Sequence, residues 1–313
     1  MVINLISIIL TPPGIEYMKY LREVARYYDV FIAEVPDVEG VRRYLNGEID
    51  FNQLLYEIEY FDVNYAREFY GVLRELIRNG IEVLPVDPYG LISMMIRIKV
   101  VTGGLSSTVM SNEERYIAYM EAKIAEAYRG YNSALFRRSF DDSVRWVIKY
   151  ARLDAERIKF RSELRARELT KVLGALRNRD VLIHADHYNE ILVEYLGNKL
   201  MCRPSVMRLN DAVSRKLGIK AFRHPGLALT HNYLYGITMN KDEEYLLGAQ
   251  ALIYAILRMK ALGGVDRGLL GDRAVLIDNS LTRFAYNLGL SETRRLFHRV
   301  MEIPRSTFRV KLR

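Results

Sequence analysis

Short apolar runs alternate with amphipathic stretches over the first two hundred residues. The runs predict four β-strands, at 3–10, 29–36, 81–90 and 178–187. Between the first two runs, apolar residues recur at helical spacing over 15–28. Strands that alternate with helices predict a mostly parallel sheet with helices on its faces, which is an α/β three-layer domain.

Longer helical patterns occupy other parts of this region. The acidic stretch 37–64 predicts helical or irregular structure, and 66–80 predicts an amphipathic helix that stops at an Asn-Gly pair. Residues 111–175 are rich in Glu, Arg, Ala and Tyr and keep a helical period. They predict two or three long helices, inserted as a lid or cap. Another helix is expected directly after 178–187.

The pattern changes beyond residue 200. We expect a short helix over 205–218, a strongly apolar helix over 242–264, a strand over 272–280 and a last helix near 291–302, whereas 220–236 has no clear period. These features predict two parts. The first is an α/β domain over 1–200 with the helical insert 111–175, and the second is a basic, mostly helical extension over 201–313.

Composition narrows the class of protein. A single cysteine excludes an intramolecular disulfide and a cysteine-cluster metal site. The sequence contains no apolar stretch of about 20 residues, the length that spans a bilayer, so we expect a soluble, cytoplasmic protein. Glutamine is scarce and Arg, Glu, Tyr and Ile are plentiful. That balance is typical of hyperthermophile proteins.

The net charge of +8 is unevenly placed. Residues 1–200 carry 27 basic and 29 acidic side chains, a net of −2, whereas residues 201–313 carry 19 and 9, a net of +10. The last twenty residues alone have a net charge of +6. This asymmetry indicates an anionic partner for the C-terminal part, such as nucleic acid. The alternative is a basic tail that pairs with the chain's own acidic surface.

Candidate chemical groups follow three of the predicted strands. Glu34, Asp87, His184 and His187 lie where those strands end, and parallel sheets bind ligands at that edge. Carboxylate and imidazole groups hold divalent metals such as Mn, Co or Zn, or act as general acids and bases.

Each of these residues also has a structural interpretation. Glu34 can pair with an arginine of the long helices, Asp87 can start the turn at Pro88, and His184 can cap the helix that follows. His224 and His231, in the basic part, are secondary candidates for the site. Neither a Gly-rich phosphate loop nor a GxSxG elbow occurs in the sequence.

Two segments carry a family resemblance. DVFIAEVP and LRARELTKVLGALRNRDVLIHADHYNEILVEYL resemble the TraB/TIKI and ChaN/erythromycin-esterase-like superfamily, over roughly residues 1–200. Matched position by position, Glu34 takes the place of that superfamily's strand-end glutamate. Arg165 takes the place of its arginine, Leu169 that of its methionine, and His187 that of its turn histidine.

The resemblance implies a hydrolase, which would be a metal-dependent peptidase or an esterase. Glu34 and His187 would hold a divalent ion or activate water, and Arg165 would neutralise an anionic intermediate. One departure concerns the turn after the first strand, which reads ILTPPGIEY and lacks the superfamily's histidine. The site would then bind metal differently, recruit His184, or have lost catalysis.

Two non-enzymatic functions compete with this interpretation. The basic C-terminal region could bind nucleic acid through phosphate contacts and stacking on interleaved Tyr233, Tyr235, Phe297 and Phe308. The arginines expected to make the phosphate contacts are Arg294, Arg295, Arg299, Arg305 and Arg309. Alternatively, the chain is a scaffold that forms homo-oligomers through its apolar helix at 242–262.

Overall fold

The β-strands of the chain form one sheet in which every pair of neighbours is parallel. The computed structural model describes residues 5–58, 62–101, 110–176, 178–200, 203–262 and 270–303. Within these ranges five strands occur in the order β3-β2-β4-β1-β5. Their bounds are β1 Ile6–Thr11, β2 Val30–Ala33, β3 Glu82–Pro85, β4 Val181–Asp186 and β5 Ser205–Arg208. The α/β class and the four predicted strands are confirmed.

The fifth strand, β5, was missed because it has a weak signal. It pairs with β1 at the edge of the sheet and covers only Ser205–Arg208, of which the first and last residues are exposed. Two apolar residues between polar ones do not form a recognisable apolar run. The helix predicted over 205–218 is confined to α9, Leu209–Lys216.

The chain folds into two units, and each is described by itself. Unit 1 comprises Met1–Ala118 and Lys159–Lys216, and unit 2 comprises Tyr119–Ile158 and Leu217–Arg313. The division differs from the predicted boundary at residue 200. The middle of the predicted insert, Tyr119–Ile158, groups with the C-terminal helices. The long helices α6 and α7 therefore each contribute residues to both units.

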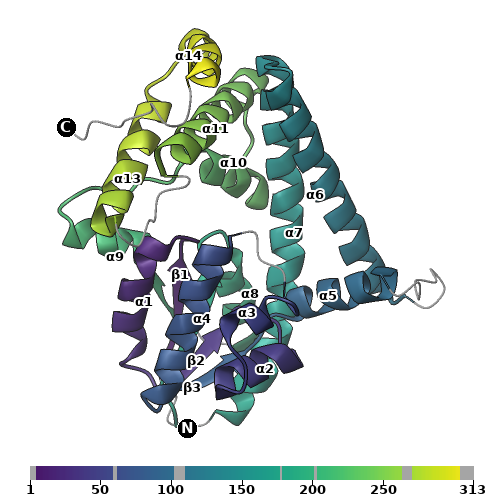
Figure 1. Cartoon of the computed structure of the whole chain (residues 1–313), viewed down its shortest axis with the longest axis vertical. Helices are drawn as coiled ribbons and strands as arrows, with labels where there is room; N and C mark the ends of the chain where they lie inside the picture. The colour runs from purple at the N-terminus through teal and green to yellow at the C-terminus, as the bar shows by residue number, and fades with distance from the viewer. Residues whose placement is uncertain are drawn as a thin grey trace. The chain divides into compact units, whose positions relative to one another are not determined.

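Helices cover both faces of the sheet in unit 1 (Figure 1). Ile8, Ile32 and Ile183 point to the face that packs against Leu169 of α7 and Leu192 of α8. The alternate residues of the same strands point to the other face, which α1 and α4 cover, as expected for strand geometry. The helices that lie wholly in unit 1 are η1 Ile15–Tyr17, α1 Met18–Ala25, α2 Glu39–Asn46, α3 Phe51–Leu54, α4 Val63–Arg78, α5 Pro88–Val101, α8 Ile191–Leu200 and α9 Leu209–Lys216.

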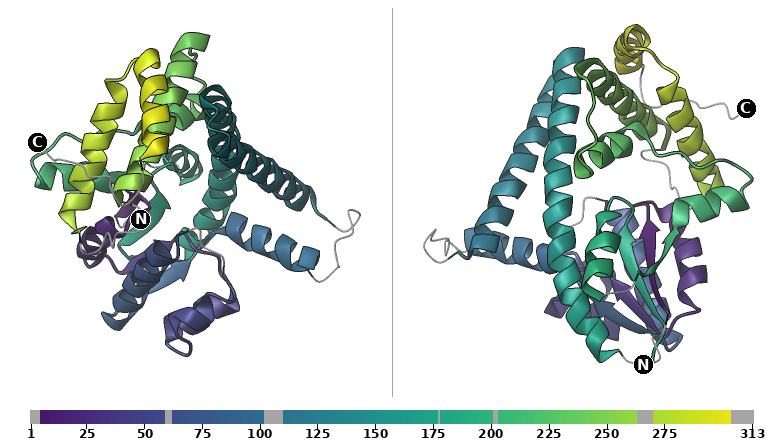
Figure 2. Two further views of the ribbon diagram at one scale, coloured as in Figure 1. Left: turned by 45° about the horizontal axis from the view of Figure 1, so that its top comes forward. Right: turned by 180° about the vertical axis from the view of Figure 1, so that it is seen from behind.

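Unit 2 is helical throughout its described part, as predicted for the C-terminal extension. Its core combines Phe140 and Val144 with residues of the C-terminal helices, including Leu252, Leu281 and Phe297. The long helices are α6 Asn112–Phe136 and α7 Phe140–Ala175, and the C-terminal ones are α10 Pro225–Leu234, α11 Lys241–Leu262, α13 Asp272–Tyr286 and α14 Leu290–Glu302 (Figure 2).

The strand predicted over 272–280 was wrong, because this segment is the first part of α13. The local run Val275-Leu276-Ile277 favours a strand. The buried positions Ala274, Val275, Leu281, Thr282 and Ala285 nevertheless recur at helical spacing once the whole segment is considered. Packing along the full helix therefore overrides the short apolar run.

Helix α11 is the core helix of unit 2. Among the described helices it alone is long and apolar enough to cross a membrane, with a mean hydropathy of 1.2, and 56% of that window is buried inside the unit. Its buried residues include most of Gly248–Leu257, which packs against α10, α13 and α14. This burial is compatible with a soluble protein.

A close helix–helix contact in unit 2 gives a test of its packing. A Cβ atom added at Gly130 of α6 would overlap the indole ring of Trp146 on α7. We expect Gly130→Ala to lower the free energy of unfolding by about 1–3 kcal/mol, as overpacking does. Urea unfolding followed by circular dichroism measures this.

The matched control for Gly130 is Gly71 of α4, where an added Cβ would meet no atom within 4 Å. Gly71→Ala should instead raise stability, by roughly 0.5–1 kcal/mol, because glycine is a poor helix former. Equal effects of the two substitutions would contradict the contact with Trp146.

Candidate functional site

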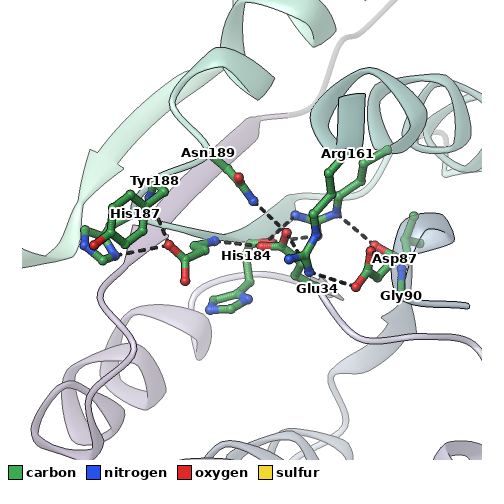
Figure 3. A network of polar contacts seen from close by, with 11 residues as sticks. Glu34, Asp87, Gly90, Arg161, His184, His187, Tyr188 and Asn189 are labelled. Carbon is green, nitrogen blue, oxygen red and sulfur yellow. Dashed lines mark hydrogen bonds and ion pairs between the residues drawn. The ribbon is translucent and has the colours of Figure 1, made fainter. Parts of the chain in front are cut away.

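Glu34 lies at the centre of a polar network at the carboxyl edge of the sheet (Figure 3). It directly follows β2, and its side chain is almost wholly buried. One carboxylate oxygen, Oε2, accepts the backbone N–H of Asp186 at 2.7 Å, and the other, Oε1, accepts Nδ2 of Asn189 at 2.6 Å. The carboxylate therefore connects the end of β2 to the turn after β4.

Two arginines of α7 complete the contacts of Glu34. Arg161 Nη2 lies 3.2 Å from Glu34 Oε1 and 2.8 Å from Asp87 Oδ2. Arg165 Nη1 lies 3.3 Å from Glu34 Oε2. The two arginines are four residues apart, so they lie on the same side of the helix. The predicted pairing of Glu34 with an arginine of the long helices is confirmed.

Arg165 is held by backbone carbonyls as well as by Glu34. Its side chain is fully buried, its Nε donates to the carbonyl of Val86 at 2.8 Å, and its Nη2 donates to that of His184 at 2.7 Å. Burial lowers the pKa of Arg165, and Glu34 opposes this shift. Arginine stays protonated in proteins, so a full positive charge lies under the sheet edge.

The pKa of Arg161 is shifted in the opposite direction to that of Arg165. Burial opposes its charge, but the carboxylates of Asp87, Glu34 and Asp186 more than offset burial and raise the pKa of Arg161. Its side chain remains 28% exposed. Its Nε is buried and has no hydrogen-bond partner among the described residues.

Asp87 lies at the sheet edge with the other candidate residues, and it also starts the turn at Pro88, as its position predicted. Its Oδ1 accepts the backbone N–H of Gly90 at 3.1 Å, which satisfies a free amide in the first turn of α5. Its other oxygen, Oδ2, pairs with Arg161. Asp87 therefore belongs to the network while also starting a helix.

Asp186 and His187 form a carboxylate–imidazole pair at the end of β4. Asp186 Oδ1 lies 3.2 Å from Nδ1 of His187, an ion-pair contact that does not have hydrogen-bond geometry. The same oxygen accepts the backbone N–H of Tyr188 at 2.9 Å. Burial raises the pKa of Asp186, but His187 and the Tyr188 amide outweigh burial, so the net shift is downward. The His187 side chain is 15% exposed and its backbone N–H donates to the carbonyl of Thr11.

His184 lies on the opposite face of the sheet from Arg165 and Glu34. Its ring centroid is 4.6 Å from that of Phe69 and 5.9 Å from that of Phe31. Neither ring nitrogen has a hydrogen-bond partner among the described residues. Burial, with a smaller contribution from Arg165, lowers the pKa of His184 to about 3. The helix-capping role is not seen, because this side chain is enclosed by aromatic rings.

The metal hypothesis fits this arrangement poorly. Both oxygens of Glu34 are engaged by N–H donors and guanidinium groups, and those positive charges would repel a divalent ion. Within the ranges that the structure describes, no three His, Cys, Asp or Glu side chains are grouped so that they could hold a metal ion. The predicted set of Glu34, His184 and His187 is not brought together as ligands.

The secondary candidates His224 and His231 have local contacts in unit 2. His224 is the N-cap of α10, where its Nδ1 accepts the backbone N–H of Leu227 at 3.1 Å, and its ring stacks on Tyr254 with centroids 4.6 Å apart. The ring of His231 lies 4.5 Å from that of Tyr235. The contacts of His224 indicate a structural role.

The predicted nucleic-acid arginines have different surroundings. Arg294 makes a two-point ion pair with Asp141, at 2.6 and 2.8 Å. Arg295 and Arg299 are exposed on α14, and Arg305 and Arg309 lie outside the described residues. Phe297, predicted to stack on bases, is fully buried in the core of unit 2, so that part of the prediction was wrong.

Sequence reasoning missed Arg161 and Asn189. Arg161 precedes Arg165 by one helical turn, and this spacing is a usable signal once Arg165 is suspected. Asn189 lies in the turn after β4, where polar residues are common and have no distinguishing pattern. Only the structure shows that its amide reaches Glu34.

The buried network should control the stability of unit 1. Glu34→Gln removes the negative charge that faces Arg165 and Arg161, and we expect it to lower the free energy of unfolding by about 3 kcal/mol, as breaking a buried pair does. The control Glu82→Gln removes an exposed partner of Arg179 and should change stability by less than about 1 kcal/mol. Urea unfolding of both variants measures the difference.

His184 should make the protein sensitive to acid. Its pKa is depressed in the folded state, so unfolded protein takes up a proton below about pH 6.5 while folded protein does not until about pH 3. Stability is therefore fully present above pH 6.5 and is lost as the pH falls. We expect a loss of about 2 kcal/mol between pH 7.5 and pH 5.

The control for this pH dependence is His184→Leu, which fills the same apolar site without a titrating group. Urea titrations of both proteins at the two pH values isolate the contribution of His184, since Asp186, Arg161 and Arg165 remain in both. An equal loss of stability in the two proteins would show that other groups cause it.

Comparisons with known proteins give a relative of this chain but no family. No protein-family profile matches the sequence, and no solved structure matches it. An uncharacterized protein of Archaeoglobus fulgidus is 25% identical over 293 residues, which covers 93% of this chain and 97% of that protein. The chain therefore has a relative of nearly the same extent that includes both units. No function follows from that match.

Proposed function

We propose that unit 1 is a hydrolase-type domain whose catalytic pair is Asp186 and His187. The observation that carries the proposal is the 3.2 Å approach of the Asp186 carboxylate to His187 Nδ1 at the carboxyl edge of the parallel sheet. That edge is where α/β sheets bind their ligands. A carboxylate on Nδ1 orients the imidazole and leaves Nε2 to take a proton from water.

Glu34 and Arg165 act as positioning residues in this proposal. Glu34 holds the backbone N–H of Asp186, and Arg165 holds the carbonyl of His184, two residues earlier in the same strand. Together they fix the backbone from which the Asp186 and His187 side chains extend. The resemblance implied that Glu34 holds a metal or activates water. Its contacts with the Asp186 amide, Asn189 and two arginines instead favour a role in positioning.

Arg161 is the group that would receive an anionic oxygen. It is oriented by two carboxylates, and its side chain is 28% exposed although its Nε is buried. A guanidinium that is fixed in this way stabilises charge that develops on a substrate carbonyl without having to reorganise. Esters and peptides generate such an oxyanion, and the resemblance suggests the same substrate classes.

The test is a screen of chromogenic esters and fluorogenic peptides with the full-length chain. For a substrate that is cleaved, we expect His187→Ala to lower kcat by about 10²- to 10⁴-fold, the usual contribution of a general base. Asp186→Asn should lower kcat with a smaller effect on KM, because it changes the orientation of the imidazole rather than substrate binding.

His298→Ala is the matched control, since His298 is an exposed histidine of α14 in unit 2. Its activity should equal that of the unsubstituted protein. Circular dichroism and the urea midpoint confirm that each variant is folded. Full activity in folded His187→Ala, or no cleavage of any substrate, would reject the proposal.

A further inference from the structure

The last turns of α6 expose aromatic side chains beside arginines. Phe136 ends the helix with 90% of its surface exposed, and Tyr128 is exposed eight residues earlier, roughly 12 Å along the axis. Arg129 and Arg137 directly follow these aromatic residues and are also exposed, and Arg137 Nη2 lies 3.7 Å from Asp142 Oδ2. Single exposed apolar residues are common in soluble proteins. An exposed aromatic residue followed by an exposed arginine, repeated along a helix, is a more unusual surface feature than a single exposed apolar residue.

Arg138, in the turn between α6 and α7, has a backbone conformation that glycine normally adopts. Its φ is 53°, its N–H donates to the carbonyl of Leu135 at 2.9 Å, and the N–H of Ser139 donates to that of Ala134 at 3.0 Å. This is the helix-ending motif that favours glycine at this position. The arginine side chain makes no contact among the described residues that offsets the strain. Strain of this kind is often kept for function.

Helix α14 lies at the same end of unit 2 as the α6–α7 turn (Figures 1 and 2). Arg294 pairs with Asp141, three residues after Arg138, which fixes α14 beside the turn. Arg295 and Arg299 lie one helical turn apart and are exposed. Neither has an ion-pair partner in the described part of the chain.

The charge of unit 2 indicates what this surface binds. The unit carries 23 basic and 14 acidic residues, a net of +9, whereas unit 1 carries 23 and 24. Arginines contact phosphates, and exposed aromatic rings stack on unpaired bases. A membrane surface would need a broad apolar helix face, but the positions between Tyr128 and Phe136 on this side are Asn132 and Ser133.

We propose that the surface formed by the last turns of α6, the α6–α7 turn and α14 binds single-stranded nucleic acid. Phe136 stacks on a base, and Arg138, Arg295 and Arg299 contact phosphates. This site differs from the C-terminal site expected from sequence. Arg294 is engaged in an ion pair with Asp141, and Phe297 is buried in the core of unit 2. The proposal does not depend on hydrolase activity in unit 1.

Fluorescence anisotropy with short labelled RNA and DNA strands tests the proposal on the full-length chain, over a series of KCl concentrations. We expect Phe136→Ala to raise Kd roughly tenfold, within the range of one lost stacking contact. Arg138→Gly should raise Kd and reduce the slope of log Kd against log salt by about 0.7, the value for one phosphate of a single strand.

Arg138→Gly also separates binding from stability. Glycine relieves the left-handed conformation, so the urea midpoint should stay the same or rise while binding weakens. Matched controls come from unit 1. Tyr56→Ala removes an aromatic side chain that is 91% exposed, and Arg78→Gln removes an exposed arginine. Both controls should bind like the unsubstituted protein.

Three results would overturn the proposal. The first is absence of binding to either strand at low salt. The second is unchanged affinity in both Phe136→Ala and Arg138→Gly, which would place binding elsewhere on the chain. The third is binding to vesicles containing phosphatidylserine that depends on these residues, without binding to the strands, which would identify a membrane surface instead.

Discussion

The charge of Arg165, buried beneath the edge of the sheet, is the constraint on which the rest of unit 1 depends. A buried guanidinium costs several kcal/mol unless its donors are satisfied. The acceptors available to Arg165 are the Glu34 carboxylate after β2, the Val86 carbonyl after β3 and the His184 carbonyl within β4. The carboxyl ends of all three strands must therefore lie level with one another along the sheet edge, so that one helix side chain can reach all three acceptors. The arginine therefore fixes the register of α7 against the sheet.

This constraint also decides which groups remain available for chemistry. The oxygens of Glu34 are engaged by Arg165, Arg161, the Asp186 amide and Asn189, so Glu34 is poorly placed to bind a ligand directly. His184 is enclosed by aromatic rings on the other face. Of the residues at the edge, Asp186 and His187 lie just beyond the satisfied network. If Asp186 and His187 act as proposed, the network beneath them would hold their backbone in a fixed position, as preorganised catalysis requires.

The sequence indicated the sheet well because central parallel strands are buried on both faces. Their apolar runs stand out from the helices between them. The edge strand β5 and the helix α13 gave misleading signals, because one is short and half exposed and the other contains a local apolar run. The division into units does not follow the change of charge near residue 200. Helices α6 and α7 each have residues in both units. A continuous helical pattern does not show at which residue a helix stops packing in one core and starts packing in the other.

The candidate site was only partly predictable, for physical reasons. Positions at strand ends could be inferred from the topology, so Glu34, Asp87 and His187 were placed at the correct edge. Side-chain direction follows from alternation along each strand, which puts His184 on the face away from Arg165. The partners of Glu34 could not be inferred, because Arg161 and Asn189 are distant in sequence and belong to residue types that are common in helices and turns.

Most of the net positive charge of unit 2 lies in residues 217–313, which carry 15 basic and 8 acidic side chains. Residues 119–158 contribute 8 basic and 6 acidic side chains to unit 2. In that unit, arginines that join distant segments have carboxylate partners, as Arg152 has in Glu244 and Arg294 in Asp141. Exposed ion pairs add little stability individually, but they neutralise those arginines as phosphate ligands. Arg138, Arg295 and Arg299 have no ion-pair partner in the described part of the chain. This lack of pairing, and not the net charge of the unit, is the reason that they are the phosphate ligands of the proposed surface.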